Sequence, residues 1–495
     1  MATFHLRNFG CRASQADGAA LKRQLLDAGL VEAASADASD VAVLNTCTVT
    51  ATADAEVRQV IRRIRRANPD CRILVTGCYA QRAPAEIASL EGVAWVVGNS
   101  HKHAVAEILG VRNSKLETRN SEVQLDNRVD AAGPKPQGIA GMPSVAVVRP
   151  ERDATACGDG LSRWPPDSPA NGHRAQIFVG DISDEFHFVP TFPDDRTRPT
   201  LKVQDGCNAR CSFCIIPQVR GQSRSLTSAR AVEQVRALQE HGFKEIVLSG
   251  INLGSYGRDL DRRITFPALL EKILAETSIP RIRISSIEVM DVSPELIGLV
   301  ASKTRLADHF HVPLQSGCDR ILRLMNRRYW TTQYAERIHA IREALPNAAI
   351  GADVMVGFPE ESAADHATSL RFIQSLPLTY VHVFPYSRRP GTPAAGRSGQ
   401  VDGRVAHERG HEIRAAIEEK RQAFLAAQVG RALPALTLDD TVDGARLALT
   451  RNYLKVALPG ASVPPNTLLT VGVGRIFDGL LYGFPQELIP LAYRK

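Results

Sequence analysis

The amino-acid sequence predicts an α/β protein with three folded parts, and three observations support this fold class. Strand-like and helix-like segments alternate over roughly the first hundred residues. The same alternation returns in the central part of the chain, and short strand-like segments separated by turn residues fill the C-terminal end. Alternation favours parallel sheets covered by helices, whereas consecutive short strands favour an antiparallel barrel. We therefore expect an N-terminal parallel α/β sheet domain, a central partial (βα)6 barrel and a small C-terminal antiparallel β-barrel.

The domain boundaries follow from changes in composition along the chain. Its 495 residues are too many for a single hydrophobic core. Between the first two folded parts lies a stretch rich in proline, glycine and serine, including WPPDSPANG at 164–172. Such composition is typical of flexible chain and not of a packed core. The predicted boundaries are 1–111 for the N-terminal domain, 112–198 for a flexible linker, 199–427 for the barrel and 428–495 for the C-terminal domain.

Charge and cysteine content narrow the classes of function. The formal net charge of +7 favours a polyanionic partner such as nucleic acid, although a generally basic proteome would give the same value. The N-terminal segment MATFHLRNFGCR lacks the apolar core of a signal peptide, and no apolar run is long enough to span a bilayer. Nine cysteines in such a chain do not resemble a secreted disulfide framework. We expect a cytoplasmic protein without membrane association, whose cysteines serve metal chemistry.

Three cysteines of the N-terminal domain are predicted to meet at one edge of its sheet. The pattern predicts strands at 3–8, 41–44, 72–75 and 93–97, with helices at 15–28, 53–67 and 84–90. Cys11, Cys47 and Cys78 each follow one of the first three strands. Because the carboxyl ends of parallel strands share an edge, where open α/β folds bind ligands, the three thiols should come together. Buried cysteines without a ligand role are the alternative.

A second set of three cysteines lies close together in sequence. Cys207, Cys211 and Cys214 form a CxxxCxxC motif in the segment LKVQDGCNARCSFCIIPQVRGQSRS. Thiolates suit zinc or iron–sulfur clusters, and a structural zinc site needs four ligands. No fourth cysteine or histidine stands near this loop, so three thiolates fit a four-iron cluster with one open iron. A zinc knuckle is the alternative.

The central domain reads as six strands, each followed by a helical segment. The predicted strands are 201–204, 245–248, 281–285, 309–314, 350–355 and 380–384. In barrels of parallel strands, the chemistry lies at the carboxyl ends of the strands. A closed eight-stranded barrel is the competing fold, but the strand count falls short. Polar or glycine residues at these ends are candidate ligand-binding positions: Ser249, Gly250, Asn252, Ser285, Glu288, Gln315, Ser316 and Asp353.

Basic and aromatic residues occur together at two further places. The central domain contains MNRRYW, and the C-terminal domain contains RNYLK. After a helix at 406–429, strands are expected at 436–438, 445–450, 454–456, 468–473 and 480–484. Cations beside stacking rings suit single-stranded RNA loops, and an exposed helix end is the alternative for the first segment. On this basis Arg327, Arg328 and Tyr329 are candidate RNA-binding residues. The C-terminal strands resemble the RNA-binding TRAM domain, and this resemblance implies the same role for Arg451, Tyr453 and Lys455.

The CxxxCxxC segment resembles the radical S-adenosylmethionine (SAM) enzymes. Together with the three dispersed N-terminal cysteines, it is similar to the methylthiotransferase family, whose C-terminal module is an RNA-binding TRAM domain. The resemblance implies two 4Fe–4S clusters and SAM as cofactors. Cys207, Cys211 and Cys214 would hold the cluster that chelates and cleaves SAM, and Cys11, Cys47 and Cys78 would hold an auxiliary cluster with an open iron for sulfur. The strand-end residues above would then bind SAM.

The segments FGCRASQAD, NRRY and FPYSRRPGTPAA are most similar to one branch of that family. It adds a methylthio group to C2 of N6-threonylcarbamoyladenosine at position 37 of tRNA, with two SAM molecules. The aromatic C–H at C2 has no acidic proton, so the reaction needs a radical. The implied partners are the tRNA anticodon loop, SAM, a flavodoxin- or ferredoxin-like electron donor and a sulfur donor, with the enzyme a monomer.

Three alternatives remain open at this point. One is the branch that acts on isopentenyladenosine in tRNA. Another is the branch that acts on an aspartate of a small-subunit ribosomal protein. The third is a non-enzymatic RNA-binding protein with structural iron–sulfur clusters.

Overall fold

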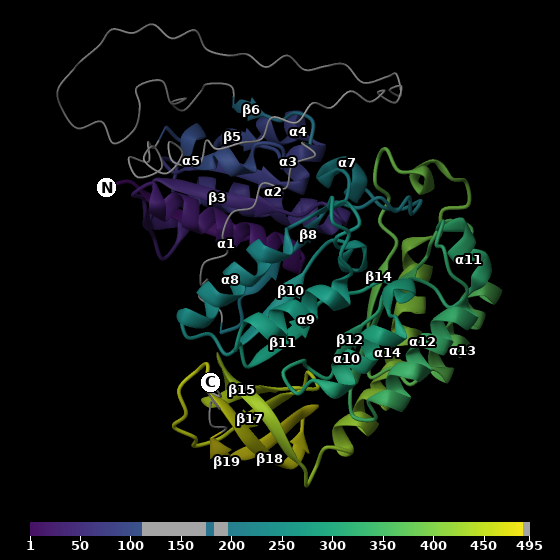
Figure 1. Cartoon of the computed structure of the whole chain (residues 1–495). Coiled ribbons are helices and arrows are strands. Elements are labelled where there is room, and N and C mark those ends of the chain that lie inside the picture. The colour runs from purple at the N-terminus through teal and green to yellow at the C-terminus, as the bar shows by residue number, and fades with distance from the viewer. Residues whose placement is uncertain (111–174, 183–196, 489–495) are drawn as a thin grey trace, which may run out of the picture.

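The computed structural model describes residues 1–110, 175–182 and 197–488. Figure 1 shows three bodies: an N-terminal sheet with its helices at the top, a barrel of strands and helices in the middle, and a small β-barrel at the bottom. The expected α/β class with its three folded parts is confirmed. None of the described helices combines the length and apolar character needed to cross a membrane.

The N-terminal body is a six-stranded sheet in the order β2-β1-β3-β4-β5-β6, and every pairing is parallel. All six residues of β3 are buried, as expected for a strand covered on both faces. The strands are β1 (Thr3–Asn8), β2 (Val31–Glu32), β3 (Val41–Thr46), β4 (Arg72–Gly77), β5 (Val93–Val97) and β6 (Gln176–Phe178). The helices are α1 (Arg12–Asp27), α2 (Ala51–Ala67), α3 (Cys78–Arg82), α4 (Pro84–Ala88) and α5 (Val105–Ile108).

The strand β6 comes from the segment that the sequence assigns to the linker. It pairs with β5 and forms the edge of the sheet. Most of the predicted linker, and with it the prediction that it is flexible, lies outside the described residues. The composition of 112–198 did not predict that its later part returns to the N-terminal domain.

The central body contains the six predicted strands in sequential order. The three-stranded sheets β11-β10-β7 and β12-β13-β14 are parallel, and the bridges Ile282↔Leu306 and Ser286↔His311 join them along one side. The result is a partial barrel. Its strands are β7 (Thr200–Lys202), β10 (Glu245–Ser249), β11 (Arg281–Ile284), β12 (His309–His311), β13 (Ala349–Val356) and β14 (Tyr380–Pro385). Between β7 and β10 lie the hairpin strands β8 (Gln204–Asp205) and β9 (Arg224–Ser225) and the short helix α7 (Ile216–Arg220).

Capping residues set the starts of several barrel helices. The hydroxyls of Thr227, Thr265, Ser293 and Ser362 each accept a hydrogen bond from a backbone N–H in the first turn. Apolar faces of these helices join the inner faces of the strands in one large core. The helices are α8 (Ser228–Glu240), α9 (Phe266–Glu276), α10 (Pro294–Ser302), α11 (Asp319–Leu324), α12 (Thr331–Ala344), α13 (Ala363–Ser375) and α14 (Gly403–Ala426).

The C-terminal body is a closed five-stranded barrel in the order β15-β16-β17-β19-β18. The predicted barrel is confirmed, but it is not wholly antiparallel, because β17 and β19 pair in parallel. Asp443–Gly444 and Asp478–Gly479 form tight turns with positive φ at both residues, the geometry that Asp-Gly favours in hairpins. The strands are β15 (Ala432–Val442), β16 (Ala445–Thr450), β17 (Lys455–Leu458), β18 (Leu468–Phe477) and β19 (Leu480–Leu488).

Two arginines of β11 attach the C-terminal barrel to the bottom of the central barrel. Arg281 donates to the Leu449 carbonyl at 3.3 Å, and Arg283 donates to the carbonyls of Thr450 at 3.2 Å and Arg451 at 3.1 Å. Both arginines also pair with the fully buried Glu245, which balances part of their charge. The amino ends of the barrel strands are therefore closed by the small barrel, and the opposite ends face the N-terminal domain (Figure 1).

Candidate active site: two sets of three cysteines

The sheet brings the three N-terminal cysteines to one edge. Cys11 precedes α1, Cys47 follows β3 and Cys78 begins α3, so the three lie at the carboxyl ends of the adjacent strands β1, β3 and β4. Cys47 and Cys78 are 5% and 2% exposed, whereas Cys11 is exposed. Gly10 has a φ of +92°, and a Cβ built on it would lie 2.4 Å from Cys47 Cβ. Glycine at this position therefore allows the Cys11 and Cys47 loops to approach each other.

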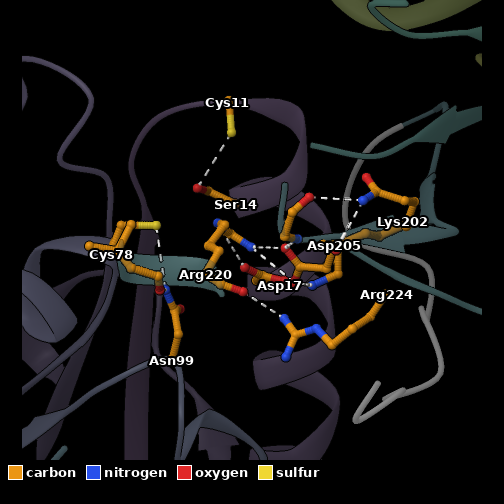
Figure 2. Close-up of polar contacts among 12 residues, drawn as sticks. Cys11, Ser14, Asp17, Cys78, Asn99, Lys202, Asp205, Arg220 and Arg224 are labelled. Carbon is orange, nitrogen blue, oxygen red and sulfur yellow. Dashed lines mark hydrogen bonds and ion pairs between the residues drawn. The ribbon is translucent and has the colours of Figure 1, made fainter. Parts of the chain in front are cut away.

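Burial and neighbouring sulfurs both affect the titration of this set. Burial, followed by the Cys78 and Cys11 sulfurs, raises the pKa of Cys47 to about 12. Asn99 Nδ2 donates to Cys78 Sγ at 3.5 Å, and Cys11 Sγ lies 3.8 Å from Ser14 Oγ (Figure 2). A buried thiol with a raised pKa stays protonated by itself, so binding of iron would release protons.

The second set lies in the loop between β8 and α7. Cys207, Cys211 and Cys214 are all partly exposed. Burial raises the pKa of Cys214 to about 12, with contributions from the Cys211 and Cys207 sulfurs. The backbone N–H of Ala209 donates to Cys207 Sγ at 3.4 Å, which helps to orient the loop.

The donor chemistry of both sets fits an iron–sulfur cluster. Within the described ranges, no three Cys, His, Asp or Glu side chains are arranged to hold one metal ion. In a cluster, however, each thiolate binds a different iron, so the sulfurs are neighbours that do not converge on a single point. Three thiols with no carboxylate or imidazole among them match the soft donor set of iron–sulfur proteins. The assignment of all six cysteines as cluster ligands stays a prediction.

Three of the predicted SAM-binding residues have buried polar atoms without a hydrogen-bond partner in the described part of the chain. These atoms are Asn252 Oδ1, Ser285 Oγ and Gln315 Oε1. The residues follow β10, β11 and β12, three successive strands of the barrel. Buried polar atoms without partners are uncommon and costly, so they are the groups that a polar ligand would satisfy. Gln315 also has a positive φ of 66°, a conformation that is unusual for this residue type.

The other candidate positions have partners or little room. Ser249 is buried, and a Cβ on Gly250 would lie 2.8 Å from Gln204 Oε1. Ser316 Oγ accepts from the Cys318 N–H at 3.2 Å, and Asp353 lies 3.4 Å from His311 Nε2. Their SAM-binding roles remain predictions.

The side chains of Arg327 and Tyr329, two of the predicted RNA-binding residues, are buried in the structure. The Arg327 side chain is 7% exposed, pairs with Glu288 and donates to Cys211 Sγ at 3.4 Å. Tyr329 is 5% exposed, and its hydroxyl donates to the Leu314 carbonyl at 2.5 Å. Arg327 therefore supports the cysteine loop from inside, and its guanidinium lies over the Tyr329 ring, 5.0 Å from the ring centroid. Neither side chain offers RNA an exposed surface. Arg328, between them, is exposed.

Two of the three candidate RNA-binding residues in the C-terminal barrel, Arg451 and Tyr453, make contacts within the protein. Arg451 pairs with Asp308 at 2.7 Å, and the Tyr453 hydroxyl accepts from Arg12 Nη2 at 3.1 Å. The Tyr453 ring stacks on His309 with centroids 4.2 Å apart. Tyr453 therefore connects all three bodies. Lys455, in contrast, is exposed, with Asp440 3.9 Å away.

The sequence did not predict a buried ionic network that lies beside the N-terminal cysteines (Figure 2). Arg220 of α7 pairs with Asp17 of α1 at 2.8 Å and with Asp205 at 2.9 Å. Lys102 pairs with Asp17 at 3.0 Å, and Lys202 pairs with Asp17 and Asp205. Asp17 and Arg220 are 203 positions apart, so no local pattern could have paired them.

Two family profiles match the chain. The family described as "Uncharacterized protein family UPF0004" matches residues 3–98, and the Radical SAM superfamily matches residues 201–373. Together they contain both cysteine sets.

Several curated relatives match nearly the whole chain. A threonylcarbamoyladenosine tRNA methylthiotransferase MtaB from Aquifex aeolicus (strain VF5) is 35% identical, covering 91% of this chain and 95% of the relative. A protein of the same name from Bacillus subtilis (strain 168) is 34% identical, covering 93% and 91%. A tRNA-2-methylthio-N(6)-dimethylallyladenosine synthase from Sphingopyxis alaskensis is 32% identical, covering 87% and 85%. Such identity over such lengths, with both cysteine sets in place, shows that the chain belongs to the radical SAM tRNA methylthiotransferases.

Proposed function

We propose that the substrate is N6-threonylcarbamoyladenosine at position 37 of tRNA, and that the enzyme adds a methylthio group at C2 with two 4Fe–4S clusters and two SAM molecules. Relatives named for this substrate align over nine-tenths of the chain. Two separate sets of three neighbouring thiols support two clusters. Relatives named for dimethylallyladenosine are only slightly less similar, so the choice between the two adenosines needs a further observation.

The position of Arg12, a cation next to Cys11, favours threonylcarbamoyladenosine as the substrate. Arg12 follows Cys11, and its recorded partner is the neutral Tyr453 hydroxyl, with no carboxylate paired to it among the described residues. Arg283 lies over the same tyrosine ring, 5.2 Å from its centroid. The threonylcarbamoyl group carries a carboxylate and a hydroxyl, which an arginine binds well through charge-assisted hydrogen bonds. A dimethylallyl group is apolar and would gain nothing from Arg12.

The chain's own residues have distinct tasks in this proposal. When bound, the clusters and SAM supply the radical chemistry and the sulfur site that activation of an aromatic C–H requires. Cys207, Cys211 and Cys214 would hold the cluster that chelates SAM. The buried oxygens of Asn252, Ser285 and Gln315 would bind polar groups of SAM. They lie at the carboxyl ends of the strands, where barrels of this kind bind their ligands. The protein then orients the adenine and excludes water.

The remaining partners are part of the same proposal. Exposed Arg328 and Lys455 would contact phosphates of the anticodon stem-loop. A flavodoxin- or ferredoxin-like donor would deliver electrons, and a separate donor would deliver sulfur. We place the protein in the cytoplasm as a monomer.

Mass spectrometry of nucleosides tests the substrate. Reconstituted protein is incubated anaerobically with SAM, sulfide, dithionite and one of two anticodon stem-loops, bearing either threonylcarbamoyladenosine or dimethylallyladenosine. We expect a methylthio product from the first alone. Product from the second alone would overturn the assignment in favour of the other branch.

An Arg12 variant tests the carboxylate contact. Arg12→Gln should raise the KM for the threonylcarbamoyl stem-loop by about tenfold, since a hydrogen bond to a charged group contributes about 1.5–3 kcal/mol. Arg12→Lys should recover part of the loss. An unchanged KM in both variants would remove the argument from Arg12.

A further inference from the structure

The two cysteine sets are joined by a direct contact between short helices. Cys78 is the first residue of α3, and Ile215, which follows Cys214, caps α7. Cys78 packs with Ile215 and Val219 in one small buried cluster. Each helix thus extends directly from a cysteine loop, and movement of one loop would be transmitted to the other.

Asn99 reinforces this contact with one amide group. Its Nδ2 donates to Cys78 Sγ at 3.5 Å and to the Val219 carbonyl at 2.8 Å. One side chain of the N-terminal domain therefore binds both a predicted auxiliary-cluster ligand and the helix that follows the SAM-cluster loop.

Arg220 is the last residue of α7, and its guanidinium adds an ion pair to the contact between the two domains. It is 2% exposed and comes from α7, but it pairs with Asp17 of the N-terminal domain. Figure 2 shows Arg220 between Cys78 on one side and Asp17 and Asp205 on the other. Its Nε has no hydrogen-bond partner in the part of the chain that the structure describes.

Arg220 belongs to a cluster of buried cations that share two carboxylates. Among the described residues, Lys102 and Lys202 pair with the same carboxylates as Arg220, namely Asp17 and Asp205. Burial alone would lower the pKa of Arg220, but Asp205, Cys78, Asp17 and Cys11 together raise it above its usual value. The guanidinium is therefore charged. Arg220 follows Val219, which packs against Cys78, and Figure 2 shows it on the side of Asp17 that faces Cys78. A buried cation is stabilised by an anion that lies beside it.

We propose that Arg220 is a positioning residue that fixes the N-terminal cysteine site against the SAM-cluster loop and stabilises the reduced form of the auxiliary cluster. This inference rests on the proposed second cluster. Three thiolates make such a cluster anionic, and reduction adds one more negative charge. The electron comes from a low-potential donor, and the step forms and breaks no bond. A fixed cation beside the cluster favours the reduced form, because the attraction is strong in a buried site.

Redox titration of the isolated auxiliary cluster tests the proposal. The full chain with Cys207, Cys211 and Cys214 replaced by Ala serves as the parent, so that only one cluster contributes to the EPR signal. In this parent, Arg220→Gln should disfavour reduction at least tenfold, a shift of the midpoint by about 59 mV to more negative values for one electron. Arg220→Lys should restore most of the difference, because it keeps the charge.

A second variant and a control separate charge from stability. Asp17→Asn removes a neighbouring negative charge and should move the midpoint in the opposite direction, to more positive values. Arg409→Gln removes another buried arginine, whose recorded partner is Glu361 at 2.7 Å, and should leave the midpoint unchanged.

The outcomes distinguish this inference from the proposed function. A parent protein that binds no iron would contradict the second cluster itself. A normal parent whose midpoint is the same in Arg220→Gln would overturn the role of Arg220 and leave the two-cluster proposal standing. If the Arg220→Gln variant does not retain iron, the midpoint of the Asp17→Asn variant becomes the test. A midpoint in Asp17→Asn that is unchanged or more negative than in the parent overturns the inference.

Discussion

The two cysteine sets are built by opposite means. Cys207, Cys211 and Cys214 lie within one loop, so local chain geometry holds them together. Cys11, Cys47 and Cys78 come from three separate loops, and the register of β1, β3 and β4 brings them together. The loop set is partly exposed, whereas two sulfurs of the dispersed set are buried. A site that admits a ligand such as SAM must remain open, whereas a site assembled by a sheet depends on the domain core.

The strongest test of this comparison separates the two half-reactions. Cys211→Ala should abolish formation of 5′-deoxyadenosine completely. Cys47→Ala should still produce it under reducing conditions, but should give no methylthio nucleoside. Chromatography of both products from the same anaerobic reaction measures this. Methylthio product from the Cys47→Ala enzyme would falsify the auxiliary-cluster role.

Iron content gives the next largest effect. Each four-iron cluster accounts for half of the expected iron, about eight atoms per chain. Replacing Cys207, Cys211 and Cys214 together by Ala should leave about four, and the same should hold for Cys11, Cys47 and Cys78. Iron analysis and circular dichroism of the two triple variants provide the check. A folded triple variant without any iron would show that the sites are not independent.

The ionic network between the sites should contribute to stability in a pH-dependent way. Burial alone would raise the pKa of Asp17, but Lys102, Lys202 and Arg220 hold it well below the usual carboxyl value. Its contribution is therefore present above about pH 4, the value of an unfolded aspartate, and is lost as the pH falls toward the folded pKa.

Asp17→Asn should lower the free energy of unfolding by about 3–5 kcal/mol at pH 7, because Lys102 loses its ion pair and Arg220 and Lys202 lose one of their two carboxylate partners. The deficit should shrink in acid, where the wild-type carboxylate also loses its charge. Urea unfolding at several pH values measures both effects. A deficit of the same size at all pH values would mean that packing, and not charge, is responsible.

The smallest expected effect concerns the binding of tRNA, the substrate of this family. Lys455→Ala should weaken tRNA binding by a few-fold and reduce the slope of its salt dependence by about one. SAM cleavage without tRNA should not change. Binding measured at several salt concentrations is the readout, with Lys303→Ala as a control cation on the central barrel. Equal effects of the two variants would remove Lys455 from the RNA surface.

The sequence predicted the six cysteine positions at strand ends and in the loop, because strand–helix alternation and the CxxxCxxC spacing are local patterns. It also predicted the six barrel strands and the C-terminal barrel, whose Asp-Gly turns are strong local signals. The strand β6 was missed, because three residues in a proline- and glycine-rich stretch carry too little pattern.

The residues that connect the sites could not be predicted in the same way. Asn99, Asp17 and Arg220 act through contacts between domains, and their types are common on surfaces. Arg327 and Tyr329 were misinterpreted for a related reason. A basic and aromatic segment looks like an RNA surface until the tertiary structure shows the guanidinium buried against Glu288 and Cys211.

The hydrogen bonds that close the bottom of the central barrel have a consequence for biosynthesis. Arg281 and Arg283 emerge from the ribosome about 170 residues before their carbonyl partners at 449–451. Domains fold largely in the order of synthesis. Until the last strands are synthesised, Arg281 and Arg283 of the central barrel therefore lack the hydrogen bonds to these carbonyls. A chain that stops before residue 449 therefore loses more than a C-terminal module. It lacks the final step in the folding of its catalytic domain, and a premature stop there should yield a protein that proteases degrade.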